Sequence, residues 1–254
     1  MNELLKLTAH QVKEKKYDKA ILAIGACEAH GQHIAEGCDT IVSYELSKRV
    51  ADKVEGLLVL PPVTVGYSGH YDTFPFSLTI GYETTIHVIY DLMESVIRNG
   101  IYHIFLMNGH DGNIAPIEIA SRKIKEKYPK ARVAALPAWW VTAGELLPEG
   151  TFEVWDGLGH GGEGETSIAY YLFPQWCEPD RATCVIPDNL PPYVDIKWDF
   201  SEITDTAQTG DATVATAEKG KMMTEVLVNA VSEAIRELDK KGWDYHTTGI
   251  KSEK

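Results

Sequence analysis

The chain has 254 residues, a formal net charge of −13, 44% apolar residues and 24% charged residues. This length and composition suit one large soluble α/β domain with a substantial core. The negative charge argues against a nucleic acid or an anionic membrane surface as a partner, because no basic stripe could offset it. No apolar run is long enough to span a bilayer, and the N-terminus lacks the apolar stretch of a signal peptide, so we expect a cytoplasmic protein.

Short apolar runs alternate with segments of helical periodicity along the chain. The expected strands cover residues 20–26, 57–60, 102–107 and 131–136. The expected helices cover residues 3–16, 39–54, 84–98, 114–128, 165–172 and 213–239. This alternation predicts an α/β fold, a three-layer sandwich in which helices cover both faces of a mainly parallel sheet, with residues 1–254 as a single domain.

Three segments between these elements lack a regular pattern. Residues 65–81 are rich in glycine, histidine and aromatic residues, and residues 139–159 hold three tryptophans. Loops this long inside a compact domain are usually functional. Residues 174–210 carry many prolines, and we expect them to wrap the surface or a neighbouring subunit.

Histidines and acidic residues gather in three places, two of them directly after an expected strand. They are residues 28–33 (Glu-Ala-His-Gly-Gln-His) with Asp39, residues 108–113 (Asn-Gly-His-Asp-Gly-Asn), and residues 160–167 (His-Gly-Gly-Glu-Gly-Glu-Thr-Ser). Carboxylate and imidazole groups are ligands that divalent metals take from proteins. Because open α/β sheets build their sites at the carboxyl ends of the strands, we expect one metal site at that edge.

The spacing suggests a role for each group. Glu28 and His30 project to the same side of an extended segment, and Asp39, at a helix start, can bridge two metals. His110 lies in a glycine-flanked turn that presents its imidazole. Such a set can hold two metals about 3.5–4 Å apart and activate a water. His160 is a candidate for proton transfer, although a further metal ligand or an ordinary loop histidine remains an alternative.

Other polar residues of these segments are expected to play lesser parts. His33 projects to the opposite side of its segment, so we expect it to support a ligand rather than to bind metal. The cysteines form no CxxC pair and are expected to be free thiols, with a ligand or nucleophile role for Cys27 or Cys38 as the alternative. Neither a GxSxG elbow nor a GxGxxG or Walker sequence is present.

The three motifs, in this order, resemble the creatininase family of metal-dependent amidohydrolases. The resemblance spans most of the chain and implies a three-layer α/β subunit, two divalent metal ions (zinc, manganese or both, with iron as an option) and a homohexamer. It implies metal binding by Glu28, His30, Asp39 and His110. It also makes His160 the catalytic residue.

One position departs from the family pattern. Creatininase proper has a ligand glutamate two residues after the second-motif histidine, where this chain has Gly112. We expect Glu165 to replace that ligand, with Asp111 or Glu163 as alternatives and a helix-capping role as the competing interpretation of Glu165. The departure points away from creatinine itself as the substrate.

Substrate binding is assigned to Trp140 and Trp155, which resemble the tryptophans on the mobile loop of creatininases, and to Asp111. The expected reaction is hydrolysis of a small cyclic substrate, most simply a cyclic amide, by a metal-activated hydroxide. Three alternatives remain: C–C cleavage of a cyclic ketone such as a keto-inositol, a lyase or isomerase working through an enolate, and a non-enzymatic metal-binding module.

Overall fold

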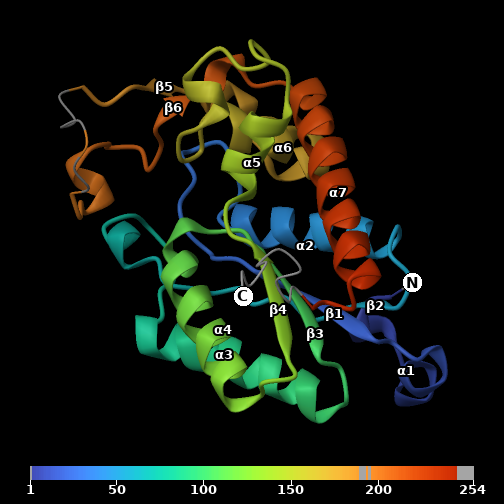
Figure 1. Cartoon of the computed structure of the whole chain (residues 1–254). Coiled ribbons are helices and arrows are strands. Elements are labelled where there is room, and N and C mark those ends of the chain that lie inside the picture. The colour runs from blue at the N-terminus through green and yellow to red at the C-terminus, as the bar shows by residue number, and fades with distance from the viewer. Residues whose placement is uncertain (1, 189–192, 194–195, 245–254) are drawn as a thin grey trace, which may run out of the picture.

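The computed structural model describes residues 2–188, 193 and 196–244. Its central sheet has the order β2-β1-β3-β4, and every pairing in it is parallel (Figure 1). The strands are β1 (Lys19–Ile24), β2 (Leu57–Val59), β3 (His103–Asn108) and β4 (Arg132–Leu136). Because β1 and β3 are neighbours and end in register at Ile24 and Asn108, the loops that follow them begin side by side.

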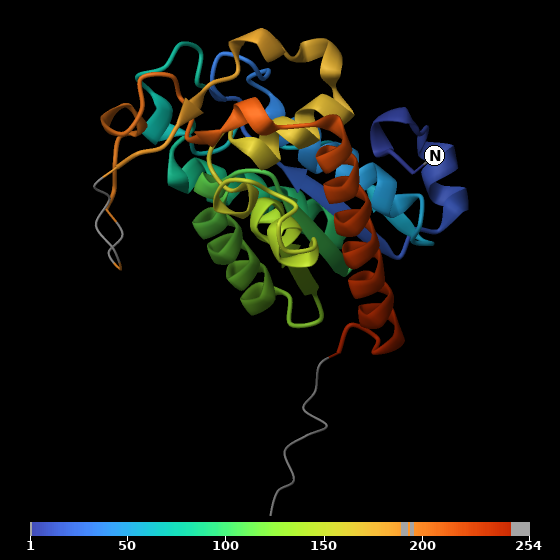
Figure 2. The ribbon, with the colours of Figure 1, turned by 90° about the horizontal axis from the view of Figure 1, so that it is seen from above.

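Helices cover both faces of this sheet. One face carries α3 (Tyr82–Arg98) and α4 (Ile114–Lys127). The other face carries α2 (Cys38–Ala51), α5 (Trp139–Leu146), α6 (Glu163–Leu172) and α7 (Ala217–Lys240). Helix α7 packs against α2, α5 and α6, and Figure 2 shows it at the side of this layer. The predicted three-layer α/β sandwich is therefore confirmed.

The two cores follow from the alternation of side chains along β1. Ile21 packs into the core shared with α2 and α7, whereas Ala20 and Leu22 face the core shared with α3 and α4. Successive side chains of a strand point to opposite faces, so a strand buried on both sides reads as a continuous apolar run. This explains why residues 20–24 show no polar alternation.

Some expected boundaries were wrong. Residues 139–146 form α5 instead of the start of a long loop, because fully buried Trp139 and Ala143 anchor one side of this short helix. Helix α2 has Gly37 as its N-cap, so Asp39 lies in the first turn and its side chain is free for other contacts. The proline-rich segment contributes a short antiparallel pair, β5 (Cys184–Val185) with β6 (Gly210–Asp211).

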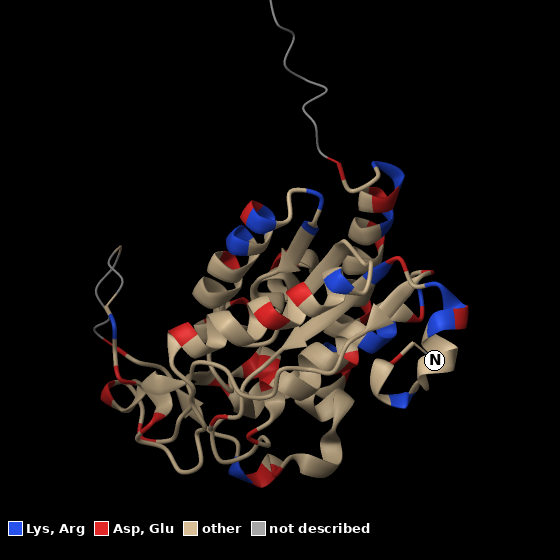
Figure 3. Ribbon diagram, turned by 90° about the horizontal axis from the view of Figure 1, so that it is seen from below, with Lys and Arg blue, Asp and Glu red and all other residues tan. Residues whose placement is uncertain are grey.

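The remaining elements are short. Helix α1 (Ala9–Lys15) precedes the sheet, and a capping box between Thr8 and Gln11 stabilises its N-terminal end. Seen from below, Lys and Arg are interspersed with Asp and Glu on the outer helices (Figure 3). Among the described residues, no helix is both long and apolar enough to cross a membrane.

Candidate metal centre and active site

The candidate site lies where β1, β3 and the first turn of α2 meet. Glu28 and His30 follow β1, His110 follows β3, and Asp39 enters from α2. The approach is close at Gly109, where a Cβ atom would overlap the carbonyl oxygen of Asp39. Only glycine allows the end of β3 to come this near to the helix. The local sequence thus brings the predicted ligands of three elements together.

Two buried carboxylates form the centre of the site. Glu28 is 0% exposed and Asp39 is 2% exposed. Among the described residues, neither carboxylate oxygen of Glu28 has a hydrogen-bond partner, and Oδ2 of Asp39 has none either. Buried anions are very costly unless a cation or hydrogen-bond donors compensate them. These unpartnered oxygens therefore indicate a place for cations.

His30 is oriented by the backbone. Its Nδ1 donates a hydrogen bond to the carbonyl oxygen of Glu28 at 3.0 Å, so that nitrogen carries the proton. Its Nε2 lies 2.9 Å from Oδ1 of Asp39 and 3.9 Å from Oε2 of Glu165. In the neutral ring the Nε2 lone pair would face two carboxylates, which is favourable only with a cation or proton between them.

His110 is also oriented by a backbone carbonyl, but through Nε2 instead of Nδ1. Its Nε2 donates to the carbonyl oxygen of Tyr67 at 2.7 Å. Its Nδ1 lies 3.1 Å from Oε1 of Glu28 and 3.2 Å from Oδ2 of Asp39. Asp39 thus presents one oxygen to His30 and the other to His110, as a carboxylate that bridges two cations would.

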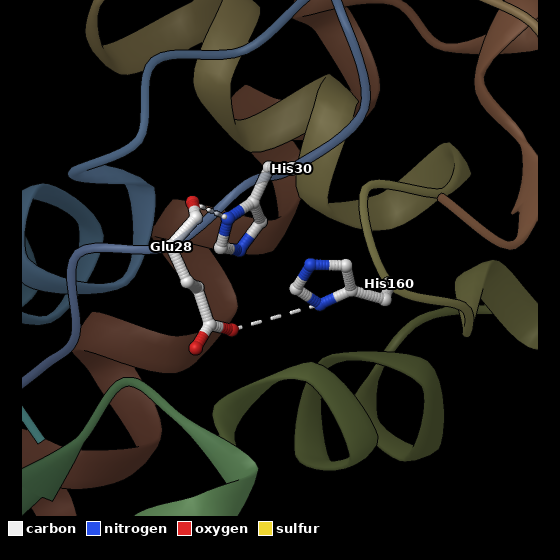
Figure 4. A group of neighbouring side chains, drawn as sticks. All are labelled: Glu28, His30 and His160. Carbon is white, nitrogen blue, oxygen red and sulfur yellow. Dashed lines mark hydrogen bonds and ion pairs between the residues drawn. The ribbon is translucent and has the colours of Figure 1, made fainter. Parts of the chain in front are cut away.

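His160 approaches the same carboxylates from the third motif. Its Nε2 donates to the carbonyl oxygen of Ala29 at 2.7 Å, and its Nδ1 lies 3.9 Å from Oε1 of Glu28. Figure 4 shows the Glu28 carboxylate pointing toward this ring, with His30 beside it. The ring centroids of His30 and His160 are 4.1 Å apart. The backbone bond leaves Nδ1 as the nitrogen of His160 that can exchange a proton at the site.

Glu165 and Glu163 have different surroundings. Oε2 of Glu165 accepts from the backbone N–H of Gly161 at 2.6 Å and faces His30. Glu163 instead accepts from the backbone N–H of Glu153 at 2.8 Å and pairs with Lys219 at 2.5 Å. Glu163 therefore has its own partners away from the histidines, and Glu165 is the carboxylate of this motif that the structure brings to the site.

The pKa values reflect this crowding of charges. Burial acts to lower the pKa of His30, but Asp39 and the other carboxylates outweigh it and raise the value to about 10. Burial raises the pKa of Glu165 to about 7. Burial lowers the pKa of His160 well below its usual value, and His30 acts in the same direction. The carboxylates thus favour a positive charge beside them, and His160 favours the neutral ring.

The donor set fits divalent metal ions. Within the described ranges, three groups each have ligand atoms that lie within 4.8 Å of one another: Glu28 with His30 and His160, Glu28 with Asp39 and His110, and His30 with Cys38 and Asp39. The groups share residues, so they describe adjoining positions rather than separate sites. Imidazole and carboxylate donors with backbone carbonyls behind the rings are typical of zinc and manganese centres.

The cysteines are free thiols, and Cys38 is the one whose sulfur lies among the candidate ligand atoms. Cys38 is fully buried, and burial together with Glu165 raises the pKa of its thiol well above the usual value. Cys27, Cys177 and Cys184 are free thiols as well. His33 donates from Nε2 to the Thr166 hydroxyl at 2.8 Å, and that hydroxyl donates to the carbonyl oxygen of Gly161. His33 therefore buttresses the third motif.

The three residues predicted to contact the substrate differ in exposure. Trp140 is half-buried against the core of α2 and α7, and Trp155 is 43% exposed. Asp111 is exposed at the turn after His110. Trp139 is fully buried, so at least one of the three tryptophans is a core residue.

Two aromatic residues at the site were missed by the sequence analysis. The ring of Tyr71 lies 4.5 Å from that of His160, and the ring of Phe200 lies 5.2 Å from it. The length and aromatic content of residues 65–81 indicated a functional loop, but nothing in the sequence singled out Tyr71 within it. No local signal marks Phe200.

Comparison with known proteins gives the family. A family model described as creatinine amidohydrolase matches residues 5–235. The chain belongs to the creatininase family. A creatinine amidohydrolase of Pseudomonas putida is 30% identical, over 85% of this chain and 88% of that protein. A mycofactocin precursor peptide peptidase of Mycobacterium ulcerans is 24% identical, over 85% and 84%. A 3-dehydro-scyllo-inosose hydrolase of Thermotoga maritima is 25% identical, over 91% and 82%.

Solved creatininase structures share the fold. A mutant creatininase complexed with creatine superposes with a TM-score of 0.81 at 29% identity, covering 92% of this chain and 97% of that one. A manganese form superposes with a TM-score of 0.79, also at 29% identity, covering 93% and 98%. A form described as Zn-Zn is also among them. This chain is therefore a metal-dependent hydrolase of the creatininase family, whose candidate cluster fits the same metals.

The departure of this family member at Gly112 has a structural reason. A Cβ atom at this position would overlap the carbonyl oxygen of Tyr67 and the ring of His110. The backbone of the 65–81 loop thus fills the space that a side chain at position 112 would need. The same carbonyl oxygen accepts the hydrogen bond that orients His110.

Proposed function

We propose that this chain is a hydrolase that opens a small cyclic amide, with two divalent metal ions, zinc or manganese, held by Glu28, His30, Asp39, His110 and Glu165. One observation carries the proposal. Backbone carbonyl oxygens orient His30 and His110 so that the second nitrogen of each ring faces buried carboxylates. The oxygens that face His110, Oε1 of Glu28 and Oδ2 of Asp39, have no hydrogen-bond partner among the described residues. The family and the similarity to a creatinine amidohydrolase support the amide as the reacting group.

The chain's own residues would divide the chemistry. Bound divalent cations supply Lewis acidity, which polarises a carbonyl group and lowers the pKa of water. The burial of Glu28 and Asp39 keeps their charges directed at those cations rather than at solvent. His160, neutral and facing Glu28 through Nδ1, would take a proton from the attacking water and return it to the leaving nitrogen.

A direct assay tests this function. The protein would be stripped with a chelator, reloaded with zinc or manganese, and offered lactams, cyclic ureides, formamides and keto-inositols in water enriched in oxygen-18. We expect ring opening of a cyclic amide with one labelled oxygen in the product, and loss of turnover in the stripped protein. Turnover without label would instead indicate a lyase or isomerase and would overturn the proposal.

A second candidate is cleavage of a cyclic ketone. The similarity to a 3-dehydro-scyllo-inosose hydrolase, over 91% of this chain, favours including it. Labelled product from a keto-inositol alone would replace the amide assignment. The single domain, the hexamer, the cytoplasmic location and the substrate contacts of Trp140, Trp155 and Asp111 stay predictions.

A further inference from the structure

An aromatic ring from the 65–81 loop lies against the ring of His160. Tyr71 ends the short 3-10 turn Gly69–Tyr71 and is 4% exposed. Its ring centroid lies 4.5 Å from that of His160 and 6.5 Å from that of His110. Tyr71 thus lies beside the candidate proton-transfer residue and near one of the candidate metal ligands.

A second ring joins it from a distant part of the chain. Phe200 begins another 3-10 turn, Phe200–Glu202. Its ring lies 4.6 Å from Tyr71 and 5.2 Å from His160. The two segments are also linked by a hydrogen bond from the Thr73 hydroxyl to Asp199 at 3.3 Å. Tyr71 and Phe200 therefore form a small aromatic wall, joined from two loops, over His160.

The hydroxyl of Tyr71 is unusual within this wall. The residue is 4% exposed, and no hydrogen bond to this hydroxyl occurs in the part of the chain that the structure describes, so the oxygen keeps some access to solvent. A phenol titrates at about pH 10, so at neutral pH this hydroxyl carries its proton and can donate a hydrogen bond.

We propose that Tyr71 is a further catalytic residue, whose hydroxyl donates a hydrogen bond to the substrate carbonyl oxygen, and that Phe200 gives the site a preference for flat rings. This inference rests on the proposed hydrolytic function. When water adds to the carbonyl carbon, the C=O π pair moves onto that oxygen, and a waiting donor stabilises the negative charge. Tyr71 keeps its proton throughout, and His160 handles the proton of the water. Removal of one such donor typically costs about 10²–10³-fold in rate.

The kinetic test compares two Tyr-to-Phe variants. Tyr71→Phe keeps the ring and removes the hydroxyl, and Tyr82→Phe is the matched control on a 42% exposed tyrosine. For a substrate found in the assay above, we expect kcat to fall about 100-fold or more in Tyr71→Phe, with unchanged metal content, and to stay near wild type in Tyr82→Phe. If kcat of Tyr71→Phe stays within about threefold of wild type, the hydroxyl is not the donor.

A binding test does not depend on the substrate. Benzohydroxamate and acetohydroxamate, which share a metal-binding group, would be titrated into the zinc-loaded protein by calorimetry. We expect benzohydroxamate to bind more tightly. The difference should shrink about three- to tenfold in Phe200→Ala, the usual worth of one aromatic pair. Phe76→Ala, which removes an 85% exposed ring of the 65–81 loop, is the control and should change nothing.

The outcomes separate this inference from the proposed function. The wild-type protein could hydrolyse none of the carbonyl compounds while Phe200→Ala loses the preference for the aromatic hydroxamate. This result would support the aromatic wall and contradict the proposed reaction. If hydrolysis occurs while Phe200→Ala keeps the full preference, the wall is wrong and the proposed function stands. An equal loss in Phe76→Ala also contradicts the wall.

Discussion

Nε2 of His30 lies 2.9 Å from Oδ1 of Asp39, while the other oxygen of this carboxylate faces His110. Asp39 therefore contacts both histidines of the candidate centre. We therefore expect Asp39→Asn, which keeps the shape and removes the charge, to lose both metal ions and nearly all activity. Metal analysis by mass spectrometry checks this. Asp111→Asn is the control and should keep its metals. Full metal content in Asp39→Asn would show that Asp39 is not a ligand.

His160 should act on protons rather than on metal. Its Nδ1 is farther from Glu28 than that of His110, and a backbone carbonyl orients the ring. We expect His160→Ala to keep both metals and to lose about 10²–10⁴-fold in kcat, with partial rescue by added imidazole. Loss of a metal ion in this variant would make His160 a ligand instead.

Glu165 and Glu163 offer a matched pair of substitutions. Glu165→Gln should lower the metal content from about two ions to about one per chain, because Glu165 faces His30. Glu163→Gln should keep the metals and lose about 1–3 kcal/mol of stability, because Lys219 would lose its buried partner. Urea unfolding and metal analysis of both variants provide the comparison. A Glu165→Gln protein with a full metal complement contradicts the assignment.

Trp140 and Trp155 can be tested for the substrate contact that the family resemblance implies. If they cover the substrate, kcat/KM of Trp140→Ala and Trp155→Ala should fall by more than about threefold, which corresponds to roughly 0.7 kcal/mol. Trp139→Ala is the structural comparison, because this fully buried ring should cost about 3–5 kcal/mol of stability. Values within threefold for both Trp140→Ala and Trp155→Ala would remove these two residues from the substrate site.

The stability should depend on pH through His33. Burial, with His30, lowers the pKa of His33 to about 4 in the folded protein, against about 6.5 when unfolded. Between about pH 6.5 and 4, His33 therefore binds a proton in the unfolded chain but stays neutral in the folded chain. The stabilising contribution is complete above pH 6.5 and is lost as the pH falls toward 4.

Urea unfolding of the metal-free proteins between pH 4 and 6.5 measures this effect. The free energy of unfolding should fall more steeply with acidification in wild type than in His33→Gln, by up to about 1.4 kcal/mol per pH unit. Parallel curves for the two proteins would show that His33 titrates normally in the folded state.

The sequence predicted the placement of the metal-ligand candidates well, and the reason is topological. Glu28, His30 and His110 follow two strands that proved to be adjacent and parallel, so their loops meet at one edge of the sheet. Asp39 was expected at a helix start and lies in the first turn of α2. The hydrophobic periodicity locates the ends of strands and helices, and parallel strands place the loops that follow them at one edge of the sheet. No knowledge of side-chain contacts is needed for this prediction.

The orientation of the histidines could not be predicted in the same way. It depends on the carbonyl oxygens of Glu28, Tyr67 and Ala29, which every residue possesses and which leave no trace in the sequence. Phe200 escaped prediction because it reaches Tyr71 across more than a hundred residues. Helix α5 was missed because the tryptophans and nearby proline and glycine suggested a loop, whereas burial of Trp139 decides its structure.

The close approach of Tyr67 to Gly112 restricts which substitutions could add a metal ligand at position 112. Any side chain at position 112 meets the Tyr67 carbonyl oxygen, which also holds His110 in place. A glutamate introduced there alone would displace the loop and release the histidine together. A ligand introduced at position 112 therefore requires a change in residues 65–81 as well, and the effects of the two changes on activity should not be additive.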